Sequence, residues 1–507
     1  MFNDEKTGRP LREEVKGAGD LSRIDATIDG GKFKADWASL SRMEPPSWFA
    51  DAKFGIFTHW GLYSIPAYRN EWYSRNMYIQ GYPEFEHHVE TYGPQKEFGY
   101  KDFIPMFKAE RFDPDEWLDL FRRAGARYYM PVAEHHDGFQ MYRSELSTWN
   151  AFDMGPHRDL IGELRRATLE HGLHFALSNH RAEHWWFMGH GREFDSDVRE
   201  PMHRGDFYWP AMPEPDNQDI FSKPYPTDEY LEDWLLRVCE LIDAYRPELL
   251  YFDWWIQHEA FKPYIKRLAA YYYDRADEWG SPAAICYKND GMAWGAGIVD
   301  VERGGFSQPK PFVWQTDTAV ARNSWCNTTS LDHKSVPEIL AALLDAVSKN
   351  GNLMLNVGPR ADGTIDPEER RMLESIGAWM DVNGEGIYGS RPWHVAQEGP
   401  TTTADGGFSD QEASAFTSQD FRYTSASGSV YAFQLVPDPK GHALLTAFAP
   451  QGHEGSAFHG VISGVEELGV GPVPYRCTDR GLEVDGLKEG VGSTGTGLPL
   501  GIKIEVE

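Results

Sequence analysis

Short apolar or β-branched segments alternate with amphipathic segments from Lys53 onward. Segments of the second kind, such as "DPDEWLDLFRRAGA" at 113–126, place apolar residues three and four apart, which is typical of helices. Asp113 and Pro114 open this one with a polar cap and a proline in the first turn. Further helices are predicted at 159–172, 227–247 and 336–351. Strands are predicted at 53–60, 126–133, 173–179, 248–255, 283–289, 297–302, 312–318 and 352–358.

Eight strands with intervening helices predict a parallel sheet closed into a (β/α)8-like barrel of the TIM type. The barrel is expected to be irregular, because the connections between the fifth, sixth and seventh strands are too short for full crossover helices. After Trp393 the chain becomes rich in Gly, Ser and Thr, with strand-like "VYAFQLV" and "HALLTAFA". This texture predicts a C-terminal all-β sandwich. The expected division is a polar leader at 1–36, a catalytic barrel at 37–393 and a β-sandwich domain at 394–507.

Composition and charge exclude several classes of function. The length of 507 residues exceeds the usual size of one core, and the formal charge of −29 argues against binding nucleic acid. No apolar run of about 18 residues predicts a membrane span, and the N-terminus lacks the apolar segment of a secretory signal. The four cysteines are scattered without a C-x-x-C pair, so neither a zinc ribbon nor a disulfide framework is expected. The chain is therefore expected to be cytoplasmic, and the sequence leaves homo-oligomer formation open.

Ionisable residues gather at the ends of the predicted strands. In a (β/α)8 barrel the carboxyl ends of all strands meet at one face, where catalytic residues lie. A single histidine there is ordinary, but a core seldom needs histidines and carboxylates at the same pole of five strands. Asp253 is the sharpest case, since "ELLYFDWW" is an apolar run interrupted by one carboxylate. The residues at this face are His59, Glu134, His135, His136, Asp137, His180, Glu183, Asp253, Glu302 and Arg303.

Four long segments together resemble a known enzyme family. They are "WFADAKFGIFTHWGLYSIPAYRNEWYSRNMY", "ARYYMPVAEHHDGFQMYRSELSTWNA", "ELLYFDWW" and "NGNLMLNVGPRADGTIDPEERRMLESIGAWMDVNGEGIYGSRPW". In this order they closely resemble the α-L-fucosidases of glycoside hydrolase family 29, from about Trp48 to Trp393. The resemblance implies a retaining exo-glycosidase that removes terminal α-linked L-fucose from oligosaccharides or glycoconjugates without a cofactor. The last hundred or so residues match only as a β domain after the barrel.

The resemblance also implies roles for two carboxyl groups. Asp253 matches the nucleophile by its place after the fourth strand, and a second carboxyl group must protonate the leaving oxygen from roughly 5–5.5 Å away. Glu302 in "DVERGG" is the choice for this acid/base, because it ends a strand and is followed by glycines. Glu71 in "NEWYSRN" is the rival. It matches a family position that usually contacts the sugar, and we assign it to binding.

The remaining family residues that grip fucose are matched in part. His59, Glu71, Trp72, His135 and His136 match residues that bind the sugar hydroxyls, which suits neutral imidazoles because they both donate and accept hydrogen bonds. Tyr251 and His180 are expected to make two further contacts with the sugar. Arg303 is a candidate for the arginine of the family's pocket. His180 departs from the Tyr-Ser pattern common in the family, in the segment "ALSNHRAEHWWF".

Three other readings stay open at this point. A metal-dependent hydrolase could use His59, His135, His136 and His180 as ligands. We expect no metal, because neither H-x-H nor H-E-x-x-H spacing occurs and adjacent histidines at a strand end point differently. A non-catalytic fucose-binding protein and a glycosidase for another sugar are the two remaining alternatives.

Overall fold

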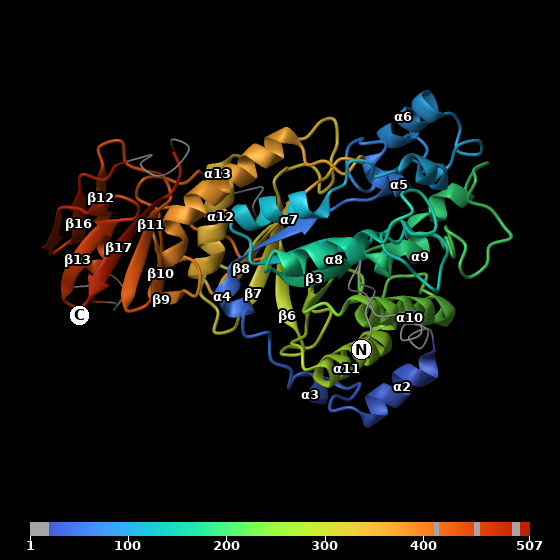
Figure 1. The fold of residues 1–507 in the computed structure, drawn as a ribbon, viewed down its shortest axis with the longest axis horizontal. Helices are drawn as coiled ribbons and strands as arrows, with labels where there is room; N and C mark the ends of the chain where they lie inside the picture. The colour runs from blue at the N-terminus through green and yellow to red at the C-terminus, as the bar shows by residue number, and fades with distance from the viewer. Residues whose placement is uncertain (1–19, 410–414, 451–456, 489–496) are drawn as a thin grey trace.

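The computed structural model describes residues 20–409, 415–450, 457–488 and 497–507. Its first domain is a closed barrel of eight parallel strands that neighbour one another in chain order (Figure 1). This confirms the predicted barrel and all eight of its strands. The strands are β1 Phe54–Thr58, β2 Tyr128–Glu134, β3 His174–Asn179, β4 Leu249–Phe252, β5 Ala284–Tyr287, β6 Ile298–Glu302, β7 Trp314–Ala319 and β8 Gly351–Val357.

Helices cover much of the outside of the barrel. Helix α7 shows how the sequence sets their limits: Asp113 accepts hydrogen bonds from the amides of Asp115 and Glu116, Pro114 occupies the first turn, and two arginines end the helix. The four helices predicted from the sequence are all present. The longer helices are α6 Pro83–Tyr92, α7 Pro114–Arg123, α8 Leu160–Glu170, α10 Asp228–Tyr245, α11 Lys262–Trp279, α12 Val336–Ser348 and α13 Pro367–Asn383, and short helices are α3 Trp37–Leu40, α4 Phe49–Ala52, α5 Tyr73–Asn76 and α9 His184–Phe187.

The barrel is irregular where the sequence predicts it. Residues 288–297 and 303–313, all of them described, connect β5 to β6 and β6 to β7 without a helix. The ring of helices is therefore open on this side. None of the helices in the described ranges is both long and apolar enough to cross a membrane.

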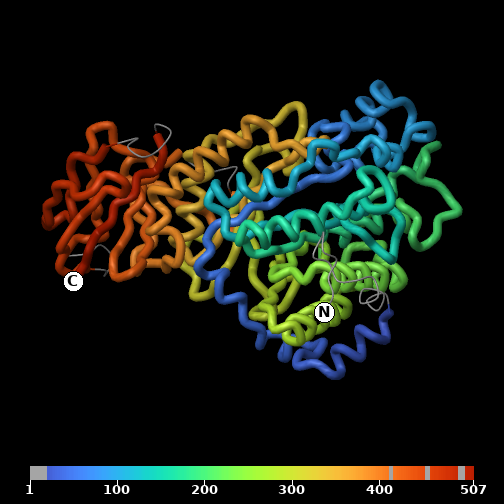
Figure 2. Tube along the Cα trace, viewed as in Figure 1, coloured from blue at the N-terminus to red at the C-terminus, as the bar shows by residue number. Residues whose placement is uncertain are grey.

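The segment expected to be a polar leader at 1–36 contains a helix in its second half. Residues Leu21–Gly30 form helix α2, which Asp20 caps and which packs along α11 (Figure 2). Ile24 and Ile28 lie one helical turn apart and are buried in this contact. Two apolar residues in a charged segment make too weak a pattern to predict a helix. The helix is stabilised by its packing against α11, which the local sequence does not reveal. Residues 1–19 lie outside the described part of the chain.

The C-terminal domain consists of two antiparallel sheets that share a hydrophobic core, as predicted. One sheet has the order β14-β13-β17-β11-β10-β9 and the other β12-β16-β15. The predicted boundary after Trp393 falls inside β9, so this strand spans both predicted domains. The strands are β9 Arg391–Glu398, β10 Phe421–Ala426, β11 Ser429–Gln434, β12 His442–Leu445, β13 Ile462–Glu467, β14 Gly471–Pro472, β15 Tyr475–Thr478, β16 Gly481–Asp485 and β17 Leu500–Val506.

Candidate active site

The barrel brings the predicted polar residues to one face. His59, His180 and Asp253 follow directly after β1, β3 and β4, and Glu302 is the last residue of β6. Parallel strands in a closed barrel end on the same side, so segments separated by more than two hundred residues meet there. The contacts below show which of these side chains touch.

Asp253 is a carboxylate held by three hydrogen-bond donors. Its Oδ2 accepts from His180 Nδ1 at 3.0 Å, and its Oδ1 accepts from the Trp254 amide at 2.8 Å and from Lys288 Nζ at 3.2 Å. Burial raises the pKa of Asp253, but the Lys288 cation and the His180 hydrogen bond outweigh it and hold this pKa well below 3.8. The side chain is still 15% exposed, so an ionised carboxylate is within reach of a ligand.

Glu302 has the opposite protonation behaviour. Burial raises its pKa, and the negative charge of Asp253 adds to this effect against the opposing charge of Lys288, so that the pKa is about 7. Lys288 Nζ lies 2.8 Å from Glu302 Oε2 and 3.2 Å from Asp253 Oδ1. The nearest oxygens of the two carboxyl groups are therefore at most about 6 Å apart, which favours the separation of roughly 5–5.5 Å in retaining glycosidases over the roughly 6.5–9.5 Å of inverting ones. Between these two pKa values one carboxyl group is ionised while its neighbour is protonated, which is the division of roles that acid and nucleophile need.

Lys288 is the central residue that the sequence analysis missed. It follows β5 directly, is 5% exposed, and also lies 3.6 Å from Asp317 Oδ2 on β7. A lysine at a strand end normally extends into solvent. Lys288 is instead surrounded by the carboxyl groups of Asp253, Glu302 and Asp317, which three other strands bring to it in the folded barrel. The signal in the sequence was its position at the end of the fifth predicted strand, in "AAICYKN".

Arg303, the candidate for the pocket arginine, lies beside Trp325, on the Glu71 side of the site and not next to Asp253. Its guanidinium group stacks over the Trp325 ring at 4.5 Å and donates to the Ala321 carbonyl. Among the lysines and arginines in the described part of the chain, Lys288 lies within ion-pair distance of Asp253 and Arg303 does not.

The Tyr251 ring packs against the Lys288 ammonium group. Its ring lies 5.1 Å from Lys288 Nζ, and its hydroxyl group donates to Asp317 Oδ2 at 2.8 Å. Tyr251 is 1% exposed, so its side chain is buried against Lys288 and Asp317.

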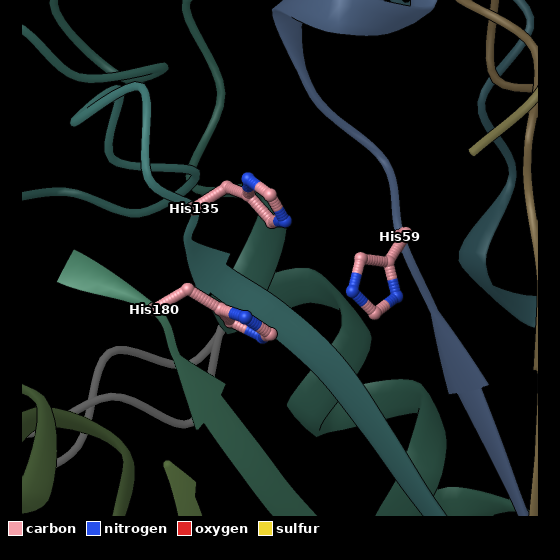
Figure 3. Close-up of side chains that lie close together, drawn as sticks. All are labelled: His59, His135 and His180. Atoms are coloured by element: carbon pink, nitrogen blue, oxygen red, sulfur yellow. The ribbon is translucent and has the colours of Figure 1, made fainter. Parts of the chain in front are cut away.

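Three buried imidazoles form one wall of the site (Figure 3). His59 donates from Nδ1 to Asn356 Oδ1 at 2.7 Å, because an amide oxygen only accepts, and its Nε2 is then free of a proton. Burial lowers the pKa values of His59 and His135 well below 6.5, so both rings are neutral. His135 Nδ1 is buried and has no hydrogen-bond partner among the described residues. These rings offer both donors and acceptors to a polyhydroxylated ligand.

The same rings are close enough to raise the question of a metal ion. One nitrogen each from His59, His135 and His180 lies within 4.8 Å of the other two, and His136, His180 and Asp253 form a second such group. However, the His135 and His180 rings are stacked, 4.8 Å apart and 22° from parallel. A metal binds in the plane of an imidazole, so stacked rings direct their lone pairs side by side instead of to one point. His180 also uses Nδ1 for Asp253 and Nε2 for Ser178. This arrangement fits hydroxyl recognition better than metal binding.

Glu71 and Trp72 lie next to the histidines, because Trp325, which binds Glu71, packs against His59 and Trp72 packs against His136. Glu71 Oε2 accepts from the Trp325 amide at 3.0 Å, and burial raises the pKa of Glu71. Trp72 packs edge-on to His136, with ring centroids 5.9 Å apart. Within the described residues Glu71 forms no ion pair with Lys288, so this lysine bridges Asp253 to Glu302 and not to the rival acid.

His136 faces two carboxyl groups. It donates from Nδ1 to the His180 carbonyl at 2.9 Å, which leaves Nε2 at 3.5 Å from Asp253 Oδ2 and 3.7 Å from Glu183 Oε1. Glu183 is fully buried and neither of its oxygens has a hydrogen-bond partner in the described chain. Burial raises the pKa of Glu183 well above 4.5 and lowers that of His136 to about 3. A protonated Glu183, to which the sequence analysis gave no role, therefore faces a neutral His136.

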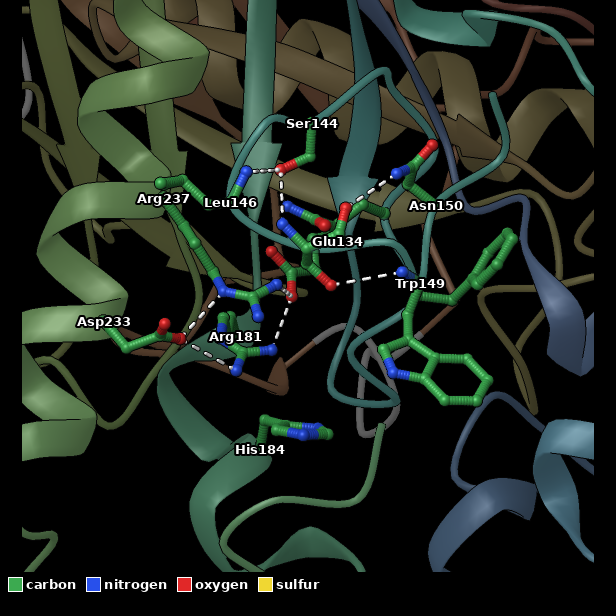
Figure 4. A network of polar contacts seen from close by, with 12 residues as sticks. Glu134, Ser144, Leu146, Trp149, Asn150, Arg181, His184, Asp233 and Arg237 are labelled. Atoms are coloured by element: carbon green, nitrogen blue, oxygen red, sulfur yellow. Dashed lines mark hydrogen bonds and ion pairs between the residues drawn. The ribbon is translucent and has the colours of Figure 1, made fainter. Parts of the chain in front are cut away.

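A buried ion network lies behind the histidines (Figure 4). Arg181 donates to Glu134 at 2.7 Å and to Asp233 at 3.1 Å, and Arg237 donates to Asp233 at 2.8 Å. Glu134 directly precedes His135, and Arg181 directly follows His180. Charges this deeply buried are stable only when paired, so the network fixes the ends of β2 and β3 relative to α10.

Comparisons with known proteins give one consistent family. The family model described as alpha-L-fucosidase matches residues 21–385. The human tissue alpha-L-fucosidase is 31% identical over 387 residues, covering 73% of this chain and 75% of the relative. The Macaca fascicularis enzyme of the same name is 32% identical with the same coverage. The solved structure of a Thermotoga maritima alpha-fucosidase in complex with fucose is 28% identical, covers 93% of this chain and 100% of its own, and superposes with a TM-score of 0.71. With a family model that spans most of the chain and a barrel, β domain and strand-end carboxylates to match, this protein belongs to the α-L-fucosidase family of glycoside hydrolases.

Proposed function

We propose that the protein hydrolyses terminal α-L-fucosyl linkages with retention of configuration, with Asp253 as nucleophile and Glu302 as acid/base. One observation supports this assignment above the others: Lys288 contacts both carboxyl groups, and the two have pKa values on opposite sides of the usual carboxyl range. The substrates are fucosylated oligosaccharides or glycoconjugates.

In the first step the Asp253 carboxylate attacks the anomeric carbon. The bond from that carbon to the glycosidic oxygen breaks, and Glu302 gives its proton to the departing oxygen. Lys288 then faces a neutral ester at Asp253 and a new negative charge at Glu302. Because the charge that raised the pKa of Glu302 is gone, the Glu302 carboxylate is more stable in this intermediate than in the free enzyme.

In the second step Glu302 accepts a proton from water as the water oxygen attacks the anomeric carbon. The ester bond to Asp253 breaks, and the carboxylate returns to the hydrogen bonds from His180 and the Trp254 amide. Two inversions at the same carbon give net retention.

The rest of the site positions the sugar. Neutral His59 and His135 bind hydroxyl groups, the buried Glu71 accepts from others, and the Trp72 ring packs on the C–H surface of the sugar. Tyr251 and His180 act through the groups they hold, Lys288 and Asp253.

The direct test is the stereochemistry of hydrolysis. Proton NMR spectra recorded during rapid turnover of an aryl α-L-fucoside should show α-L-fucose as the first product, before mutarotation. First appearance of β-L-fucose would reject retention. Binding of fucose without release of any aryl group between pH 4 and 9 would favour a non-catalytic binding protein.

A further inference from the structure

A segment of the C-terminal domain fills the side of the barrel that lacks helices. After β9, the chain passes along α12, where Thr403 donates to Asp345 Oδ1 at 3.0 Å. It then meets the connection between β6 and β7: Asp405 accepts hydrogen bonds from the Ser307 amide at 2.7 Å and the Ser307 hydroxyl group at 2.8 Å. The segment therefore follows the helix-free connection along the barrel wall.

The same segment ends beside the acid/base residue. Gly305 and Gly406 exchange backbone hydrogen bonds of 3.2 and 2.9 Å, and the Phe408 amide donates to the Glu302 carbonyl at 2.8 Å. A Cβ atom at Gly304 would lie 1.9 Å from the Gly406 carbonyl oxygen, so this approach requires glycine. Because Glu302 ends β6 at the face that carries the catalytic groups, these bonds hold the backbone of Phe408 against the end of that strand.

Phe408 is an unusual residue for this position. Its φ of 57° lies in the left-handed region, which a bulky side chain rarely adopts, yet the side chain is 54% exposed. Backbone strain at an exposed aromatic residue that is hydrogen-bonded to the backbone of Glu302 indicates a functional constraint.

We propose that Phe408 is a specificity-determining residue that packs against the leaving-group sugar, so that the C-terminal domain builds part of the aglycone subsite. This inference rests on the proposed function of Glu302. A proton donor must reach the glycosidic oxygen, and the leaving group therefore lies on the Glu302 side of the bond. The ligand class is a hexopyranose at the reducing side of the fucoside, whose C–H face packs on an aromatic ring.

The test compares substrates with and without a leaving-group sugar. For each variant, kcat/KM is measured on α-L-fucosyl fluoride, whose leaving group is a single atom, and on fucosyl-hexose disaccharides. In Phe408→Gly, which accepts the same backbone angles, the ratio of disaccharide to fluoride kcat/KM should fall about three- to tenfold. Phe408→Tyr keeps a ring and should keep the ratio. Ser427→Gly is the matched control, since Ser427 also has a positive φ, of 51°, but lies in the turn between β10 and β11.

Two results would overturn the proposal, and a third would overturn the proposed function instead. A ratio within twofold of wild type in Phe408→Gly, for every linkage tested, would overturn it. A fall in Phe408→Gly together with an equal fall in Ser427→Gly would also overturn it, because the effect would then be one of backbone stability. If wild-type protein hydrolyses neither substrate, the proposed function fails instead.

Discussion

Removal of the Lys288 cation should move the whole pH profile of the enzyme to higher pH. In Lys288→Met a buried positive charge is lost at 3.2 Å from Asp253 and 2.8 Å from Glu302. At an effective dielectric constant of about 20, a unit charge at these distances contributes about 5–6 kcal/mol to each carboxylate. That would be about four pKa units, whereas carboxyl groups beside a cation commonly shift by 1–3 units, so we expect an increase of about 1–3 units for both groups.

The sign of the change follows from the two roles. Asp253 must be ionised, so activity is lost as the pH falls through its pKa, and a higher pKa moves the acid limb of kcat/KM upward. Glu302 must be protonated, so activity is lost as the pH rises through its pKa of about 7, and the alkaline limb also moves upward. The maximal kcat should fall about 10²- to 10³-fold, because a preorganised charge at the reacting groups is gone.

The assay is kcat/KM between pH 3 and 10 on an unactivated aryl α-L-fucoside, since this parameter reports the ionisation of the free enzyme. Lys288→Arg is the control that keeps the charge, and both its limbs should stay near those of wild type. Circular dichroism across the same range checks that each variant is folded. An alkaline limb that stays at about pH 7 in Lys288→Met, or moves lower, would refute the reasoning that Lys288 sets the pKa of Glu302.

Three further predictions concern other parts of the structure. Glu302→Ala should reduce kcat/KM by about 10²-fold or more on fucosides with poor leaving groups and far less on dinitrophenyl fucoside, and an equal loss on both would redirect the acid role to Glu71. His135→Ala removes a neutral ring from the hydroxyl-binding wall, so the inhibition constant of L-fucose should rise about tenfold or less, and an unchanged constant would remove His135 from the sugar site. Ile24→Ala should destabilise the protein by about 2–4 kcal/mol in urea unfolding, whereas Asp29→Ala on the exposed face of α2 should change little; equal small effects would mean that α2 contributes nothing to stability.

Local patterns in the sequence predict the barrel well. Most of the barrel strands are apolar or β-branched runs that need no distant partner to be recognised. Asp113 with Pro114 marks a helix start by short-range chemistry alone. Helix α2 is harder, because Ile24 and Ile28 become a helix face only when α11 covers them. The irregular side of the barrel was foreseen from connection lengths, but not that the C-terminal segment around Gly406 fills it.

The active site was predictable only in part for the same reason. Strand-end positions and the family resemblance brought Asp253, Glu302 and the histidines together. Lys288 acquires its role from three carboxyl groups on three other strands, which no local pattern contains. Phe408 likewise looks like an ordinary exposed residue until its amide is seen to contact the Glu302 carbonyl.

The central claim, that Asp253 is the nucleophile, is tested most directly by trapping the glycosyl-enzyme. Incubation with 2-deoxy-2-fluoro-α-L-fucosyl fluoride, followed by proteolysis and tandem mass spectrometry, should find one deoxyfluorofucosyl group on the side chain of Asp253. The label should be absent from Asp253→Gly, and that variant should regain part of its activity with azide and release β-L-fucosyl azide. A label on Glu302 or Glu71, or full turnover by Asp253→Gly without azide, would contradict the account.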